Sequence, residues 1–301
     1  MTALGQLRVF AERVAVKPNY SVTYIREVTP RLSACNRPSS NTANGILSDK
    51  AVKRIKVAAS WLQFLSRGML VYSRQLRRHT KCKLVFITLT LPSSGNKSDK
   101  FIVAHCLQPM LKWLQRSHGC YLYIYKVEVQ EERYYRTGER VIHFHITTNR
   151  FVHHSKVRNK WNAILRNNNL LNLHESPPST EIRGVYNEKG FASYLAKYIS
   201  KKVTDPALVV NCKVWGCSHA LSNINVTLGQ DTHNDYYNTR DEFISTTSKG
   251  SKQLKHCTVH YTSLNNKKKI PLELKNEINN VTDTILKKYS SFAPSVRLKL
   301  L

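Results

Sequence analysis

The sequence predicts an α+β fold, in which helices pack against an antiparallel sheet. Runs rich in β-branched and aromatic residues predict strands, and apolar residues at helical spacing predict the helices between them. The predicted strands are 84–91, 121–130, 141–148 and 181–186. The predicted helices are 100–117, 154–165 and 190–202. The resulting order of strand, helix, strand, strand, helix, strand and helix is typical of an α+β domain.

The chain is strongly basic. Its 301 residues include 47 Lys and Arg against 19 Asp and Glu, a formal net charge of +28 at pH 7. This balance argues against an ordinary metabolic enzyme and indicates a polyanionic partner. Hydrophobic residues make up 41%, which is too many for a disordered basic tail.

Cysteine usage and hydropathy indicate the compartment. The seven cysteines are odd in number and contain no CxxC pair, which indicates a reducing cytoplasm. The N-terminus has no apolar targeting segment, and no apolar run reaches the roughly 20 residues of a membrane span. We therefore expect a cytoplasmic protein without a membrane partner.

Composition divides the chain into three regions, 1–80, 81–222 and 223–301, of which the last is polar and rich in Lys. Residues 1–48 are basic and broken by prolines, so we expect a loop or weakly ordered lead-in. Residues 50–78 have apolar positions at helical spacing and predict one long basic amphipathic helix or two shorter ones. Its basic face is either a phosphate-binding surface or a solvated one, and both interpretations stay open.

Two histidines mark a candidate metal site. Residues 121–130 and 141–148 are joined by a charged turn and form a predicted antiparallel hairpin. The period of a strand places His143 and His145 on one face, where both imidazoles can bind one divalent ion. A register that pairs Glu128 with His143 adds a carboxylate, and this ligand set suits Mn²⁺ or Mg²⁺. Glu131 and Glu132 are rival third ligands.

A second candidate lies on the predicted helix 190–202. Tyr194 and Tyr198 are four residues apart and share one helix face, and Lys197 and Lys201 form a second pair with the same spacing. A tyrosine is a nucleophile once its phenol is deprotonated, and a neighbouring lysine favours phenolate and neutralises phosphate. Two tyrosines that face the core of an amphipathic helix remain the alternative interpretation.

Three segments carry a combined pattern that extends over nearly half of the chain. They are FITLTLP at 86–92, Glu-x-Gln at 128–130 before HFH at 143–145, and YLAKYISKK at 194–202. In this order they resemble motifs I, II and III of the HUH endonucleases, and more narrowly the rolling-circle replication initiators of microviruses, filamentous phages and small plasmids. The Trp-Gly-x-Ser segment at 215–218 resembles one common in the phage members.

The resemblance implies a ferredoxin-like or RRM-like antiparallel sheet, with an HUH endonuclease domain over 81–222. It implies that Glu128, His143 and His145 hold Mg²⁺ or Mn²⁺ for the nicking of single-stranded DNA. Thr88 and Thr90 alternate onto one face of the first motif strand, where they support the site.

The resemblance also assigns the nucleophile. Tyr194 or Tyr198 would attack the scissile phosphate, leaving a 5′-phosphotyrosine and a free 3′-OH primer, and the second tyrosine would join the strand again. Lys197 and Lys201 would position the phosphate or the phenol. In this interpretation both catalytic tyrosines and both lysines belong to one helix.

The expected partners are single-stranded DNA at a replication origin, a host DNA polymerase and, because the sequence has no GxxxxGK[ST] motif, a host helicase. The expected location is the cytoplasm of a bacterial host of the parent phage or plasmid. Two alternatives remain open, another HUH enzyme such as a relaxase or transposase, and a non-catalytic protein that binds single-stranded nucleic acid. A covalent protein–DNA link separates the enzymes from the binder.

Overall fold

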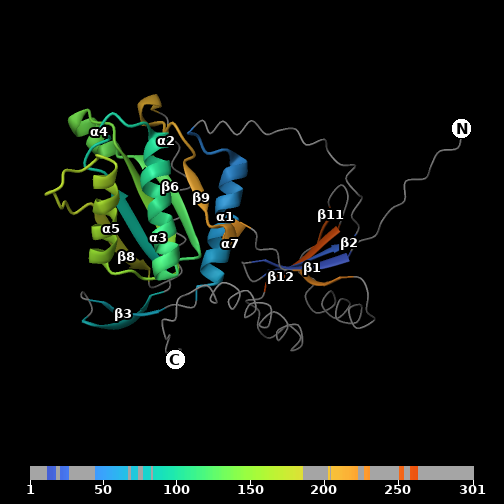
Figure 1. Ribbon diagram of the computed structural model, residues 1–301. Coiled ribbons are helices and arrows are strands. Elements are labelled where there is room, and N and C mark those ends of the chain that lie inside the picture. The colour runs from blue at the N-terminus through green and yellow to red at the C-terminus, as the bar shows by residue number, and fades with distance from the viewer. Residues whose placement is uncertain are drawn as a thin grey trace, which may run out of the picture. The chain divides into compact units, whose positions relative to one another are not determined.

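The chain divides into two compact units, one of residues 1–40 and 224–288 and one of residues 41–223 and 289–301 (Figure 1). The structure is a computed structural model. It describes residues 12–17, 21–26, 45–66, 69–73, 77–82, 84–185, 203, 205–222, 227–230, 251–253 and 258–263. Within these ranges, no helix is long and apolar enough to cross a lipid bilayer.

A five-stranded sheet forms the centre of the second unit. Its strands are β5 (Leu84–Thr90), β6 (Tyr123–Val129), β7 (Ile142–Thr148), β8 (Thr180–Val185) and β9 (Trp215–Cys217). The spatial order is β8-β5-β7-β6-β9, and every pair of neighbours is antiparallel. The predicted α+β fold with an antiparallel sheet is confirmed, and it is compatible with the ferredoxin-like architecture that the resemblance implies.

Helices cover one face of this sheet. They are α2 (Asp99–Ile102), a π-helical turn η1 (Val103–Leu107), α3 (Gln108–His118) and α5 (His154–Asn167). Alternate strand residues, such as Ile87, Phe144 and Ile146, pack with these helices in one buried cluster. Trp161 of α5 is fully buried there, meets the Phe144 ring edge-on and donates from Nε1 to the carbonyl of Thr90 at 2.8 Å. Burial of the apolar alternate positions leaves the other set of side chains for the opposite face.

The predicted helix over 50–78 is wrong in its second half. Helix α1 (Asp49–Phe64) begins at the N-cap Ser48, and a two-stranded ribbon follows, β3 (Met69–Ser73) and β4 (Arg78–Cys82). Val71 packs against the core while Leu70 and Tyr72 are exposed, which is the period of a strand. Short apolar runs fit both helical and strand periods, so the pattern alone did not separate the two.

The charged turn predicted at 131–140 contains a short helix, α4 (Glu131–Thr137). Gly138 ends it in the left-handed region, with φ of 72°. Arg133 of α4 donates to the carbonyls of Leu91 and Pro92, so the helix is fixed against the end of β5. The insertion therefore extends the hairpin without disturbing the pairing of β6 with β7.

The Trp-Gly-x-Ser segment has a packing role. Gly216 of β9 lies against the Tyr125 ring, and a Cβ at this position would come within 2.6 Å of it. Ser218 follows β9, and its hydroxyl accepts a hydrogen bond from the Leu221 amide in α7 (His219–Ser222). Only glycine fits beside the ring.

The first unit contains an antiparallel sheet in the order β10-β1-β2-β12-β11. Its strands are β1 (Glu12–Lys17), β2 (Ser21–Arg26), β10 (Thr227–Gln230), β11 (Ser251–Gln253) and β12 (Thr258–Ser263). The interpretation of residues 1–48 as a loop is therefore wrong for β1 and β2. The sheet joins strands that the sequence analysis assigns to separate first and last regions. Pairing with distant strands leaves no local signal in the sequence.

A bidentate ion pair fixes the chain that leads into β9. The Arg140 guanidinium donates to both carboxylate oxygens of Asp99, at 3.0 and 2.7 Å, and to the carbonyls of Ala207 and Val209. The Asn211 amide also donates to Asp99, at 2.8 Å. Asp99 is 5% exposed, so the loss of its cation would strand a buried carboxylate.

Arg140→Met is expected to lower the free energy of unfolding of this unit by about 2–4 kcal/mol. All four tryptophans lie within 41–223, so denaturation followed by tryptophan fluorescence reports on this unit. The matched control is Arg183→Met, which breaks an exposed pair with Glu181 and should change stability by less than about 0.5 kcal/mol. Equal effects of the two variants would contradict the structural role of the pair.

Candidate metal centre

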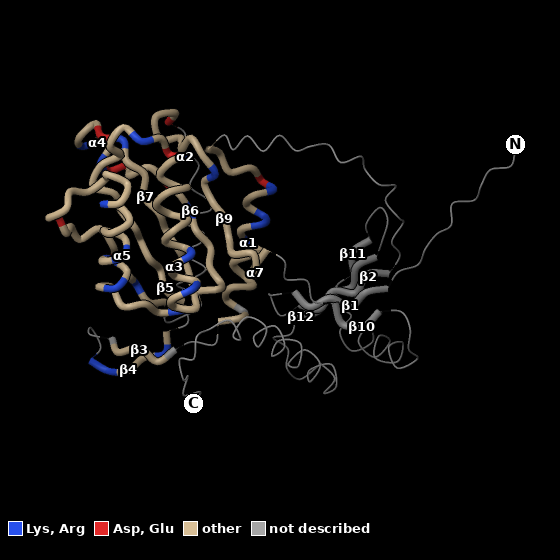
Figure 2. The backbone as a smooth tube through the Cα atoms, in the orientation of Figure 1, with Lys and Arg blue, Asp and Glu red and all other residues tan. Residues whose placement is uncertain are grey.

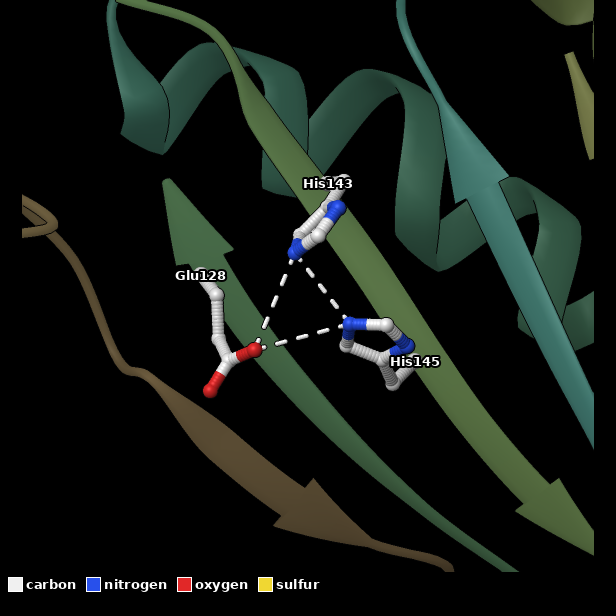
Figure 3. A group of neighbouring side chains, drawn as sticks. All are labelled: Glu128, His143 and His145. Atoms are coloured by element: carbon white, nitrogen blue, oxygen red, sulfur yellow. Dashed lines mark hydrogen bonds and ion pairs between the residues drawn. The ribbon is translucent and has the colours of Figure 1, made fainter. Parts of the chain in front are cut away.

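Glu128, His143 and His145 stand on the sheet face opposite the helical layer (Figure 3). Glu128 is the next-to-last residue of β6, and the two histidines are in the first half of β7. Glu128 pairs with His143 across the two strands, so the predicted register is confirmed. On the other side of β7, Thr90 pairs with His143 and Thr88 with His145.

The three side chains converge on one point. His143 Nε2 and His145 Nε2 are 3.1 Å apart, and Glu128 Oε2 lies 3.7 Å and 3.5 Å from them, respectively. One ligand atom from each residue falls within 4.8 Å of the others. These side chains are 10–19% exposed, so the point is accessible from one side. Two imidazole nitrogens and a carboxylate oxygen leave further coordination positions open for substrate and water.

Hydrogen bonding sets the orientation of the ligands. Thr88 Oγ1 lies 3.3 Å from His145 Nδ1. When Nδ1 carries the proton and donates to this hydroxyl, the lone pair of Nε2 faces the site, the arrangement of a ligand fixed by its outer contact. The expected support by Thr88 therefore has a direct contact, whereas Thr90 enters through its backbone position beside His143.

The electrostatics favour the ligand forms of these groups. Burial raises the pKa of the Glu128 carboxyl, but hydrogen bonds from His143, His145 and Lys126 outweigh it and hold that pKa well below its usual range. Burial lowers the pKa of the His145 imidazole, although its hydrogen bond to Glu128 acts in the opposite direction. An ionised carboxylate and a neutral imidazole are the states that bind a metal.

Lys126 is a residue that the sequence analysis missed. It precedes Glu128 by two positions on β6, pairs with His145 across the strands, and its ammonium contacts Glu128 Oε1. Strand period alone places it on the same face as Glu128, so the signal was present in the sequence. The contact leaves Glu128 Oε2 turned toward the histidines.

The rival ligands do not join the group. Glu131 and Glu132 belong to α4, and among the residues that the structure describes only Glu128, His143 and His145 form a potential metal cluster. Tyr194, Lys197, Tyr198 and Lys201 lie outside the described residues.

The fold and the site define a class: an α+β protein whose antiparallel sheet holds a carboxylate and two histidines suited to a divalent metal ion. Residues 84–203 match a family of replication-associated proteins, the one described by the replication-associated protein ORF2. The match supports a replication initiator family, and therefore a role in replication and an interaction with DNA at an origin. No curated protein and no solved structure matches the chain.

Mn²⁺ is expected to raise the melting temperature of the unit that holds this sheet. At ten times the Kd, binding to the native state contributes about 1.4 kcal/mol, or a shift of about 3–5 °C. Tryptophan fluorescence during heating measures it. His143→Ala/His145→Ala should abolish the shift, while His174→Ala, an exposed loop position, should keep it. A shift retained by the double variant would place the bound metal elsewhere.

Proposed function

We propose that the protein initiates rolling-circle replication by a metal-dependent nick in single-stranded DNA at an origin. The observation that carries the proposal is the convergence of Glu128, His143 and His145 on one sheet face, inside the segment that matches a replication-associated family. The net charge of +28 supports a nucleic-acid substrate.

The residues divide the reaction between them. Glu128, His143 and His145 would hold Mg²⁺ or Mn²⁺, which polarises the scissile phosphate and stabilises charge on its oxygens. The phenolate oxygen of Tyr194 or Tyr198 attacks phosphorus. A bond from tyrosine to the 5′-phosphate forms, the bond from phosphorus to the 3′ oxygen breaks, and that oxygen leaves with a proton as the 3′-OH primer. Lys197 and Lys201 position the phosphate or the phenol.

The described chain on either side of the tyrosine segment supports a place for that segment. β8 ends at Val185 beside Leu84, at the end of the sheet remote from the metal ligands. Asp205 accepts a hydrogen bond from Tyr135 of α4, at the end of the sheet that holds them. β8 and β9 are the two edges of the sheet, so the proposal takes the connection between them across one of its faces.

The handedness of crossovers favours the face with the ligands. β5 to β6 and β7 to β8 are parallel crossovers whose helices lie on the same face. They share one hand, because strand direction and direction of travel across the sheet both reverse between them. β8 to β9 travels in the same direction as β5 to β6 but along oppositely directed strands. The same hand, right-handed in about 98% of crossovers, then requires the opposite face, so we propose that Tyr194 and Tyr198 lie over the metal ligands.

The test of this function is a nicking assay. Labelled single-stranded oligonucleotides that tile the parent replicon are incubated with the protein and Mn²⁺, then separated on a denaturing gel. We expect one oligonucleotide to give a protein-linked band that carries the DNA 3′ of the cut, and a shorter free product with a 3′-OH. Both products should disappear in EDTA. Tight binding with no adduct from any oligonucleotide would instead assign the protein to non-catalytic binding.

The relaxase and transposase alternatives differ in substrate and product. An enzyme of plasmid mobilisation or transposition would cleave at a transfer origin or a mobile-element end. Cleavage at the replication origin, followed by extension of the 3′-OH by a DNA polymerase, supports the initiator. The polymerase and the helicase of the host remain proposed partners.

A further inference from the structure

The ribbon of β3 and β4 has one face toward the core and one toward solvent. Val71 packs against the core cluster, and Cys82 belongs to it. The residues between these positions alternate outward, with Leu70 61% and Tyr72 54% exposed. Tyr72 pairs with His79 across the strands, and Leu70 pairs with Lys81. The ribbon therefore presents an apolar and aromatic face to solvent, next to cations.

This outer face is matched to a polyanion with apolar rings. Residues 69–82 contain no Asp or Glu, while Arg77, Arg78 and Lys81 are exposed (Figure 2). The rings of Tyr72 and His79 meet edge-on, with centroids 5.5 Å apart. An exposed aromatic side chain flanked by cations is the arrangement that stacks unpaired bases and holds their phosphates.

The ribbon lies at the end of the sheet remote from the metal ligands. β4 ends at Cys82 and β5 begins at Leu84, whereas Thr90 at the other end of β5 pairs with His143. Six strand residues at about 3.3 Å each separate the two ends by about 20 Å. At about 3.4 Å per nucleotide in a stacked strand, this span corresponds to roughly six nucleotides.

We propose that the outer face of the β3–β4 ribbon, with Tyr72 as its stacking residue, binds single-stranded DNA about six nucleotides from the scissile phosphate. The inference rests on the proposed function for its substrate and extends it with a second contact on the same strand. Leu70 and His79 flank the stacked base, and Arg78 and Lys81 contact phosphates.

The first test measures binding without cleavage. A fluorescein-labelled oligo(dT) of twenty nucleotides is titrated with protein in EDTA, and anisotropy gives the Kd. Tyr72→Ala should weaken binding at least about fivefold, since stacking on one aromatic side chain contributes this much or more, and Tyr72→Phe should restore it. Arg78→Gln/Lys81→Gln should reduce the slope of log affinity against log salt by about 1.4.

A matched pair separates the ribbon from general charge. Lys112→Gln/Arg116→Gln removes the same charge from exposed positions of α3, and its affinity should stay closer to the unmodified value. Equal losses in the two double variants, unchanged binding by Tyr72→Ala, or a loss confined to a duplex of the same length would each overturn the proposal. Circular dichroism confirms that each variant is folded.

The second test uses cleavage and distinguishes this inference from the proposed function. With an oligonucleotide that extends well beyond the nick on both sides, Tyr72→Ala should raise KM and leave kcat unchanged. With one that ends about three nucleotides from the nick, it should change neither. Loss of binding by Tyr72→Ala in a protein that never forms an adduct would keep the ribbon contact and remove the nicking function. Adduct formation with unchanged binding would do the reverse.

Discussion

His145→Ala is expected to lower the rate of DNA cleavage by about a thousandfold. Loss of a ligand removes several kcal/mol of charge stabilisation in the transition state, and each 1.4 kcal/mol is about one decade in rate. His143→Ala should act in the same way, because both Nε2 atoms converge on Glu128 Oε2. Single-turnover cleavage of the origin oligonucleotide in Mn²⁺ measures the rate.

Two comparisons make the result specific to the metal ligands. His174→Ala changes a loop histidine and should cleave at the unmodified rate. Binding of oligo(dT) in EDTA should remain within about twofold in both site variants, because phosphate and stacking contacts supply that affinity. Cleavage that survives loss of both histidines would remove the proposed site, whatever the folded state of the variants.

Tyr194→Phe/Tyr198→Phe is expected to abolish the covalent protein–DNA adduct altogether. Phenylalanine keeps the ring and its packing but removes the oxygen that forms the bond to phosphorus. Each single variant identifies a role: the one that loses the first adduct changes the initiating tyrosine, and one that still nicks but cannot rejoin changes the second. Gel analysis of labelled DNA measures both steps.

Tyr72→Phe is the matched control for this pair, because it removes a phenol oxygen from an exposed tyrosine remote from the metal ligands. It should form the adduct at the unmodified rate. Binding of DNA by the double tyrosine variant should be retained, since neither phenol is needed for phosphate contacts. An adduct that persists in the double variant would mean that another residue supplies the nucleophile.

The sequence predicted the metal ligands because their geometry is local. Glu128 and His143 belong to neighbouring strands of one hairpin, so alternation and the position of the turn define which residues face each other. Lys126 follows from the same alternation but carries no recognisable ligand pattern. Thr88 reaches His145 from a strand further away along the chain, and the first motif strand placed it correctly on the shared face.

The errors occurred where long-range pairing decides the structure. β1 and β2 belong to a sheet completed by β10 and β12, so the prolines and polar residues around them indicated a loop. Residues 69–82 form a ribbon because Val71 and Cys82 pack on the core of the sheet, a contact that helical spacing alone does not reveal. The helix within 131–140 was missed because its charged residues resemble a turn.

The pairing of β2 with β12 has a consequence for synthesis on the ribosome. Tyr24 lies opposite His260, so the first strands of the chain wait for almost the last ones before their sheet is complete. At about 5–20 residues per second this delay is roughly 10–50 seconds. The central sheet, whose strands span 84–217, emerges entirely within that interval and can fold first. Until β12 arrives, one edge of β2 remains open to pairing with a neighbouring nascent chain.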